Sequence, residues 1–160
     1  MYESFSDRRL WLHWQSRLCS LSHSGYTPII LDNFCNSSQA ILEPLSALCK
    51  ERPHCYHGDI RDSQTLKTIF ADHDIQAVMH FAGLKAVGES TEKPLEYYDN
   101  NVNGTLNLVA AMKEAGVNQM IFSSSATVYG DPAKVPIDES MPTGGTTNLM
   151  ERVSTWWNDV

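Results

Sequence analysis

The stretch Met79-His80-Phe81-Ala82-Gly83-Leu84-Lys85-Ala86-Val87-Gly88-Glu89-Ser90 decides the fold of this 160-residue chain. An apolar run at 77–81 indicates a buried strand, and it leads into a turn of small residues that carries one lysine. An amide-rich helix start, Asp99-Asn100-Asn101-Val102-Asn103, comes shortly afterwards. Open α/β sheets bind ligands at the carboxyl ends of their parallel strands. We therefore expect the polar groups of this turn to face a ligand.

Strand and helix signals alternate on both sides of this stretch. Apolar runs predict strands at 26–31, 55–57, 77–81 and 119–122, and apolar spacing and caps predict helices at 40–48, after Asp62, and at 102–115. Repeated strand–helix units imply parallel strands with right-handed crossovers and helices on both faces. The sequence thus predicts an α/β fold, a Rossmann-like doubly wound parallel sheet within 25–148. The sheet is incomplete, because its first strand and glycine loop are not recognisable.

The two ends of the chain lack such patterns. Residues 1–24 show no hydrophobic period, and residues 149–160 crowd two tryptophans together without an amphipathic pattern. We interpret 1–24 as an aberrant amino-terminal segment and 149–160 as an aberrant tail. An organelle transit peptide is the alternative for a Ser- and Arg-bearing amino end, but acidic residues in the same segment argue against it.

The composition excludes several classes of function. Hydrophobic residues make up 42% and charged residues 19%, which is typical of a soluble globular domain. A net charge of −7 leaves no basic stripe for nucleic acid. No apolar run approaches the roughly 20 residues that a membrane span needs. We expect a cytoplasmic protein with neither nucleic acid nor membrane as a partner.

The cysteines and histidines near residue 50 raise the question of a metal site. Cys49, His54, Cys55 and His57 lie close in the sequence, but their spacing fits no standard zinc pattern. No CxxC pair occurs among the four cysteines. We therefore expect thiols and surface histidines, and no metal.

A second motif identifies a family. The run Phe122-Ser123-Ser124-Ser125-Ala126-Thr127-Val128-Tyr129-Gly130, taken with the opening stretch, closely resembles UDP-glucose 4-epimerases of the extended short-chain dehydrogenase/reductase family. The resemblance implies an isomerase of galactose metabolism that interconverts UDP-galactose and UDP-glucose through an NAD-bound 4-keto intermediate. It also implies a UDP-sugar substrate and a possible homodimer. Related sugar-nucleotide dehydratases, decarboxylases and reductases share the fold and remain alternatives.

Acidic residues at strand ends are the first candidates for cofactor binding. Asp32 ends a strand, where a carboxylate would bond the adenosine ribose and repel a 2′-phosphate, thus selecting NAD over NADP. From position alone, Asp32 and Asp59 could equally be turn or cap residues, and Asn100 a helix cap. The resemblance assigns twelve residues to NAD: Asp32, Asn33, Asn36, Ser37, Asp59, Ile60, Phe81, Ala82, Gly83, Lys85, Asn100 and Ser123. In that set, Gly83 would allow close backbone approach and Lys85 would supply a cation for phosphate.

The catalytic residues are only partly present. The resemblance assigns Ser125 as the catalytic serine, which would hydrogen-bond the sugar oxygen that loses its proton, whereas Tyr129 is expected to be structural. The base of the family is a tyrosine in a Tyr-x-x-x-Lys pair, where the lysine lowers the phenol pKa from about 10. Neither this pair nor a Gly-x-x-Gly-x-x-Gly phosphate loop occurs in the chain.

Shifted reading frames explain both gaps. Back-translated and read one nucleotide later, Trp11 and Trp14 each yield glycine, because tryptophan has a single codon. A consistent codon choice from Ser4 onward reads Leu-Leu-Val-Thr-Gly-Gly-Tyr-Gly-Tyr-Ile-Gly-Ser-His, which resembles the first strand and phosphate loop of the family. Read one nucleotide earlier, the segment after Asn148 contains Tyr-Gly-Thr-Ser-Lys. We hypothesise one shift before Ser4, reversed before Gly25, and another after Asn148.

Two alternatives concern the polypeptide as written. Without its central first strand, the chain would leave ladder groups unpaired, so it could be an inactive fragment of an epimerase. We also expect the sugar-nucleotide domain of the family to be absent. A small NAD-binding module that acts through interaction is the remaining possibility, and it would have to hold the cofactor without a glycine loop.

Overall fold

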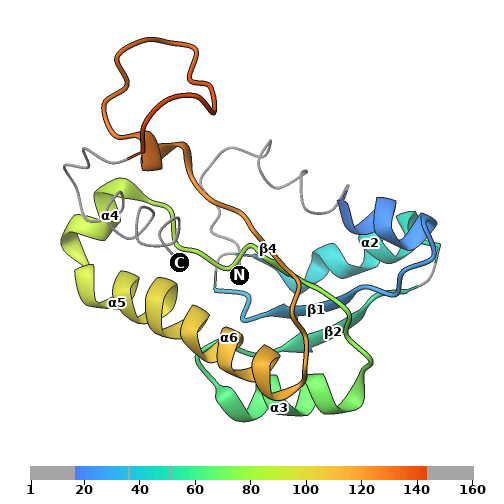
Figure 1. Cartoon of the computed structure of the whole chain (residues 1–160). Helices are drawn as coiled ribbons and strands as arrows, with labels where there is room; N and C mark the ends of the chain where they lie inside the picture. Colours follow the sequence, from blue (N-terminus) through green and yellow to red (C-terminus); the bar gives the residue numbers. More distant parts are fainter. Residues whose placement is uncertain (1–16, 36, 51, 144–160) are drawn as a thin grey trace.

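The computed structural model describes residues 17–35, 37–50 and 52–143, in which strands alternate with helices (Figure 1). A helical stretch at 17–23 comes first. The elements that follow are β1 (Ile29–Asp32), η1 (Gln39–Ile41), α2 (Leu42–Leu48), β2 (His54–His57), α3 (Ser63–Asp72), β3 (Val78–His80), α4 (Val87–Glu92), α5 (Pro94–Tyr98), η2 (Asp99–Asn103), α6 (Gly104–Glu114), β4 (Met120–Phe122) and η3 (Ala126–Tyr129).

All strand pairs in the described residues are parallel. β1 pairs with β2 from Ile29↔His54 to Asp32↔His57, and β3 pairs with β4 from Val78↔Met120 to His80↔Phe122. They form two sheets of two strands each, and no strand of the described part joins β1 to β3. The predicted α/β, Rossmann-like and incomplete sheet is confirmed.

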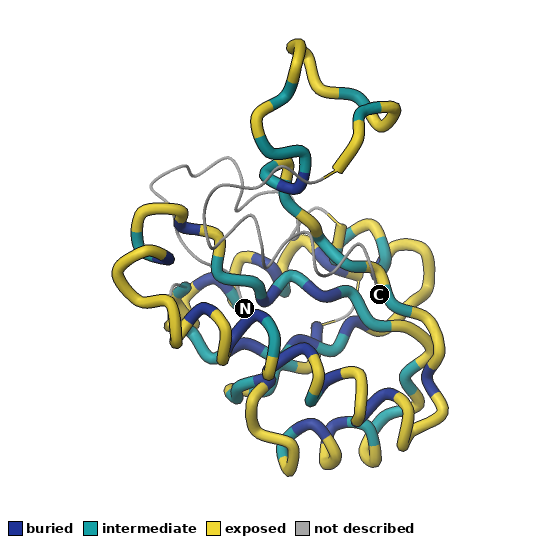
Figure 2. Tube along the Cα trace, turned by 60° about the vertical axis from the view of Figure 1, so that its left-hand side comes forward, coloured by how far each residue is buried: buried dark blue, intermediate teal, exposed yellow. Residues whose placement is uncertain are grey.

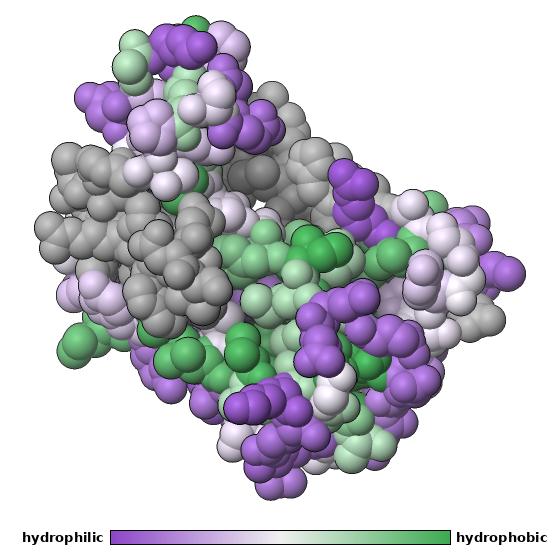
Figure 3. Space-filling view, viewed as in Figure 1, coloured by the Kyte–Doolittle hydropathy of each residue, from purple (hydrophilic) through white to green (hydrophobic). Residues whose placement is uncertain are grey.

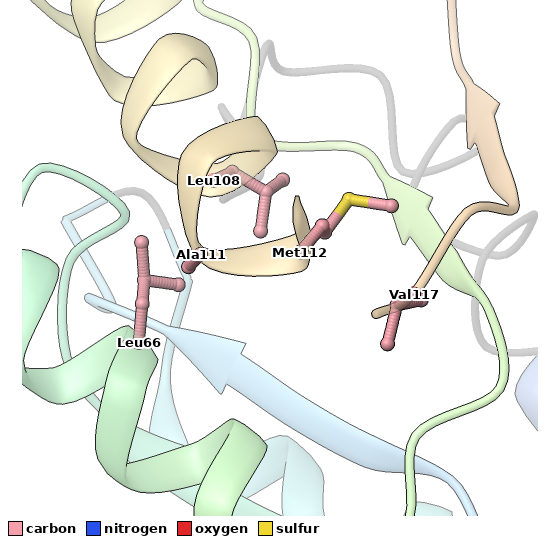
Figure 4. Packing of buried hydrophobic residues seen from close by; sticks show 5 residues of the cluster. All are labelled: Leu66, Leu108, Ala111, Met112 and Val117. Atoms are coloured by element: carbon pink, nitrogen blue, oxygen red, sulfur yellow. The ribbon is translucent and has the colours of Figure 1, made fainter. Parts of the chain in front are cut away.

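The main core lies between α3, α6 and the sheets. Asp62 caps α3 as predicted, because its carboxylate accepts from the backbone N–H groups of Gln64 and Thr65. α3 contributes Leu66 and α6 contributes Leu108, and these pack with the apolar chain that leads to β4. Figure 4 shows the buried cluster of Leu66, Leu108, Ala111, Met112 and Val117. This packing fixes the two helices against the strands whose ends carry the polar candidates.

A second cluster packs the helical stretch 17–23 against β1 and α2. Ile30 of β1 and Leu45 of α2 are buried here, and Leu18 packs against them. Figure 2 marks the buried positions along the backbone in dark blue. The organised unit therefore includes 17–24, which the sequence pattern had assigned to the aberrant amino-terminal segment.

The helix expected at 102–115 begins earlier than predicted. Pro94 occupies the first position of α5, and α5, η2 and α6 follow one another without a break. η2 is a π-helical segment, so Asn100 lies inside the helical run and is not a cap at its start. Gly116, with a φ of +73°, ends α6 as predicted.

Candidate functional site

Asp32 ends β1 and is the centre of a tight loop. Its side chain is buried, Oδ1 accepts from the backbone N–H of Phe34 at 2.7 Å, and Oδ2 accepts from Oγ of Ser37 at 3.2 Å. Phe34 adopts a φ of +54°, which turns the chain back over the carboxylate. A carboxylate has about four acceptor sites, so these bonds leave capacity for a ribose hydroxyl. Asn36, assigned to the same loop, lies outside the described residues.

Asp59 follows β2 and is held by a cation. Nη2 of Arg61 donates to Oδ2 at 2.8 Å, and Nε of Arg61 donates to Oδ1 at 2.9 Å. The bonds from Arg61 lower the pKa of Asp59 to about 2, so this carboxylate is ionised at neutral pH. Nδ2 of Asn33 donates to Oδ2 of Asp59 at 2.9 Å and thereby joins the loop after β1 to the loop after β2. Ile60 is buried beside this pair.

The loop after β3 is tied to the loop after β4 by one lysine. Nζ of Lys85 donates to the backbone oxygens of Ser123 at 2.9 Å and Ser124 at 3.2 Å, and it lies 3.3 Å from Oγ of Ser123. Burial lowers the pKa of the Lys85 ammonium. The predicted turn lysine and serine run therefore meet, although they are far apart in the sequence.

Gly83 lies in the same loop and has room for a side-chain carbon. A Cβ at this position would meet only Cε of Lys85 at 3.8 Å and Oδ1 of Asn101 at 3.9 Å, both ordinary van der Waals distances. The packing of the protein therefore does not require a glycine here. A ligand that approaches the backbone closely would require it, which is the role assigned to Gly83 from the resemblance.

Two buried asparagines hold this loop in place. Nδ2 of Asn100 donates to the backbone oxygen of Ala82 at 2.8 Å. Asn101 makes two bonds to Leu84: Oδ1 accepts from the backbone N–H at 2.7 Å, and Nδ2 donates to the backbone oxygen at 2.9 Å. The structure thus places Asn100 at the site as a supporting residue. Asn101 was missed, and its signal was the unusual run of two adjacent asparagines in one helical segment.

His80 is a second residue that the sequence pattern did not single out. It is buried at the end of β3, where Nε2 lies 2.7 Å from Oγ1 of Thr105. Because Thr105 donates its own proton to the backbone oxygen of Asn101 at 2.8 Å, it accepts from Nε2 of His80. Nδ1 of His80 then accepts from the backbone N–H of Ala82 at 3.3 Å. Burial lowers the pKa of His80 to about 4, so the imidazole is neutral.

Ser125 lies at the start of η3, beyond β4. Its Oγ accepts from Oγ1 of Thr127 at 3.0 Å and from the backbone N–H of Thr127 at 3.4 Å, so it acts as the cap of this short turn. Phe81 packs beside the second cluster, at the end of β3. Hydrogen bonds join the loop after β1 to the loop after β2, and the loop after β3 to the loop after β4. No described contact joins Ser125 to Lys85 or Asp32.

Two other expectations concern metals and membranes. Among residues 17–35, 37–50 and 52–143, no group of three His, Cys, Asp or Glu side chains could hold a metal ion. No described helix has the length and apolar character that crossing a membrane requires.

Parallel strands whose carboxyl ends carry an acid, a glycine–lysine loop and a serine run define part of a Rossmann-like, nucleotide-binding fold. A family model described as GDP-mannose 4,6 dehydratase matches residues 17–148, and the chain therefore belongs to that family.

The named relatives of this chain are UDP-glucose 4-epimerases. The chain is 56% identical over 128 residues to the UDP-glucose 4-epimerase of Yersinia pestis, and these cover 80% of this chain and 38% of that protein. The UDP-glucose 4-epimerase of Pasteurella multocida is 57% identical over 120 residues, which cover 75% of this chain and 36% of that protein. The chain thus spans less than two fifths of the length of these curated relatives.

Solved structures agree with the fold. The UDP-glucose 4-epimerase of Bifidobacterium longum, in complex with NAD+ and UDP, superposes with a TM-score of 0.86 at 46% identity and covers 91% of this chain and 43% of that chain. The UDP-glucose 4-epimerase of Stenotrophomonas maltophila, with bound NAD and formylated UDP-arabinopyranose, superposes with a TM-score of 0.83 at 36% identity. The match covers 90% of this chain and 43% of that chain.

Proposed function

We propose that this chain is the NAD-binding part of a UDP-glucose 4-epimerase, an enzyme that acts on UDP-galactose and UDP-glucose. The observation that carries the proposal is the meeting of the Gly83–Lys85 loop with the serine run at the carboxyl ends of β3 and β4. Similarity to named epimerases, rather than the shared fold, favours this activity over related dehydratases and reductases.

The described residues fit NAD. Asp32 offers a buried carboxylate for the ribose, Gly83 leaves room for a close ligand, and Lys85 supplies a positive charge. We place the other assigned residues around these three: Asn33, Ser37, Asp59, Ile60, Phe81, Ala82, Asn100 and Ser123. NAD would accept a hydride from the sugar and return it. Oγ of Ser125 would orient the sugar hydroxyl, while the base must come from a residue that the written sequence lacks.

A repaired amino end gives the sharpest test of this proposal. In the restored variant, residues 4–16 are replaced by Leu-Leu-Val-Thr-Gly-Gly-Tyr-Gly-Tyr-Ile-Gly-Ser-His. We expect calorimetric titration to show NAD binding by the restored variant and none by the written chain. Asp32→Ala should weaken that binding roughly tenfold or more, since a hydrogen bond to a charged group contributes about 1.5–3 kcal/mol. A restored variant that binds NADP as well as NAD would contradict the assignment of Asp32.

Turnover requires a catalytic base as well. In a coupled assay with UDP-galactose, the written chain should show no activity, because it lacks the base tyrosine. Activity of the purified 160-residue chain would show that turnover does not need the base tyrosine of the family.

The coding DNA tests the reading-frame hypothesis independently. The family match spans 17–148, which supports frame changes near these two positions. We infer that the codons for residues 4–15 and those after Asn148 encode the glycine loop and the Tyr-x-x-x-Lys pair in other frames. Resequencing that finds neither motif in any frame would rule out this explanation.

We also propose that the protein forms a homodimer through α5 and α6. Exposed apolar side chains follow these helices: Leu95, Tyr98, Leu106 and Val109. Figure 3 shows apolar surface over this region of the face seen in Figure 1. Leu106→Glu should shift the light-scattering mass to that of a monomer, whereas Leu48→Glu, an equally conspicuous exposed leucine on α2, should not. An unchanged mass for both variants would contradict this interface.

We also infer a reducing compartment such as the cytoplasm. In its support, the four cysteines form no disulfide among the described residues.

A further inference from the structure

Two cysteines far apart in the sequence lie side by side in the second core cluster. Sγ of Cys19 and Sγ of Cys49 are 3.3 Å apart, although 30 positions separate them along the chain. Cys19 comes from the helical stretch 17–23, and Cys49 caps the carboxyl end of α2. The fold therefore holds the two thiols in contact before any oxidation occurs.

The surroundings of the two sulfur atoms differ. Cys49 is 9% exposed and packs with Ile30 and Leu45, whereas Cys19 is partly accessible. Burial, together with the neighbouring Cys19 thiol, raises the pKa of Cys49 to about 11, so Cys49 is a neutral thiol at physiological pH. Cys19 is therefore the sulfur of the pair that a small oxidant reaches first.

We propose that Cys19 and Cys49 form a built-in oxidation site, which closes to an intramolecular disulfide when the protein meets a hydroperoxide. In the first step, Cys19 gives its proton to solvent and its sulfur attacks hydrogen peroxide, which gives a sulfenic acid and a hydroxide that takes up a proton to become water. In the second step, Cys49 attacks the sulfenic sulfur, its proton goes to the departing oxygen, and water leaves. Two thiols are thus oxidised and one peroxide is reduced, with two waters formed overall.

The geometry suits this bond. A disulfide is about 2.05 Å long, so the two sulfur atoms have to approach by roughly 1.2 Å from their present 3.3 Å. The neighbouring cysteines are less suitable. Cys35 is exposed on the loop after β1, and Cys55, in the same cluster, makes no described sulfur contact.

Closing the bond would enclose a functional part of the fold. The ring from Cys19 to Cys49 contains β1 and the whole loop around Asp32. A cross-link of this kind restricts the unfolded chain and so favours the folded arrangement of that loop. The inference does not depend on the proposed epimerase function, because it needs only the contact between the two thiols.

The test uses the full 160-residue chain, first reduced and then treated with hydrogen peroxide. We expect the loss of two hydrogen atoms by intact-mass spectrometry, a peptide pair joining Cys19 to Cys49, and a rise in the thermal midpoint that dithiothreitol reverses. Cys35→Ser should leave all three results unchanged. Cys49→Ala should abolish the cross-link and leave Cys19 as a sulfenic or higher oxide.

Other products would overturn the proposal. A bridge from Cys19 to Cys35 or Cys55, or a disulfide-linked dimer as the main product, would show that the observed contact does not direct oxidation. Cys35→Ser/Cys55→Ala keeps the pair as the only cysteines and covers the case in which Cys49→Ala fails to fold. If this variant gains oxygen atoms without losing hydrogen, the proposal is wrong.

Discussion

Nζ of Lys85 lies 2.9 Å from the backbone oxygen of Ser123, and this bond is one of the contacts that join the loop after β3 to the loop after β4. The two residues are 38 positions apart, and each follows a strand of the same parallel pair. The ammonium thus connects the Gly83–Lys85 loop to the strand end that leads into Ser125. The positive charge is held where the proposed phosphate would bind, before any ligand arrives.

Replacing this lysine should weaken the fold as well as the site. We expect Lys85→Met to lower the free energy of unfolding by about 1–2 kcal/mol, because it removes charge-assisted bonds to two carbonyl oxygens. Urea denaturation followed by circular dichroism measures this loss. Lys67→Met is the matched control, since within the described residues Lys67 forms a surface ion pair with Glu114, and its loss should change stability by less than about 1 kcal/mol. If Lys85→Met and Lys67→Met had the same free energy of unfolding, the Lys85 bonds would make no contribution to the stability of the fold.

Gly83→Ala should separate ligand binding from folding. The added Cβ has only ordinary contacts, so the free energy of unfolding should stay within about 0.5 kcal/mol. In the restored variant, the same change should weaken NAD binding, measured by calorimetry, because the methyl group occupies the space that the ligand would need. Gly58→Ala is the opposite control, since its Cβ would lie 2.8 Å from Cγ2 of Thr65, and we expect a loss of about 1–3 kcal/mol. A Gly83→Ala protein with unchanged NAD affinity would remove Gly83 from the site.

Asn101→Asp should loosen the loop that carries Gly83 and Lys85. The new carboxylate oxygen would face the backbone oxygen of Leu84, which now accepts from Nδ2 at 2.9 Å. Since an unsatisfied buried group costs about 1–3 kcal/mol, and more when it is charged, we expect a loss of about 3 kcal/mol in urea unfolding. Asn107→Asp should have little effect, because Asn107 makes its bond to Arg61 at the surface. A small effect at Asn101 would mean that Leu84 is held by other contacts.

The strands and the cap at Asp62 were predictable because their signals are local. Apolar runs gave β1 to β4 to within a few residues, and Asp62 precedes an amphipathic helix at the usual spacing. The run from α5 to α6 was harder to delimit. Its π-helical segment inserts extra residues into the turn and shifts the apolar face, so a single helical period does not fit the whole run.

The supporting shell of the site was not predictable from local patterns. Asn101 meets Leu84 across 17 positions, and His80 meets Thr105 across 25. Contacts of this kind depend on how η2 and α6 lie against β3 and the loop after it, which the sequence pattern does not specify. His80 resembled an ordinary polar residue at a strand end, although the structure makes it the buried centre of a hydrogen-bonded chain.

Stability should fall in mild acid because of His80. Its pKa is about 4 in the folded protein, below the 6.5 of an exposed histidine, so the unfolded state binds more protons in this range. The stability that the neutral imidazole contributes is complete above about pH 6.5 and is lost as the pH falls toward 4. Between pH 7.5 and pH 5, His80 alone should lower the free energy of unfolding by about 2 kcal/mol.

Urea unfolding at these two pH values measures this loss, and substitution assigns it. His80→Gln keeps a polar side chain without a titrating ring, so the fall between pH 7.5 and pH 5 should be smaller by most of that amount. Asp59, with a pKa of about 2, stays ionised throughout this window and does not contribute. His23→Gln is the control, because His23 is exposed and bonds only to the Cys19 carbonyl oxygen of its own helical stretch. If His80→Gln retains the full fall, a group other than His80 causes the acid sensitivity.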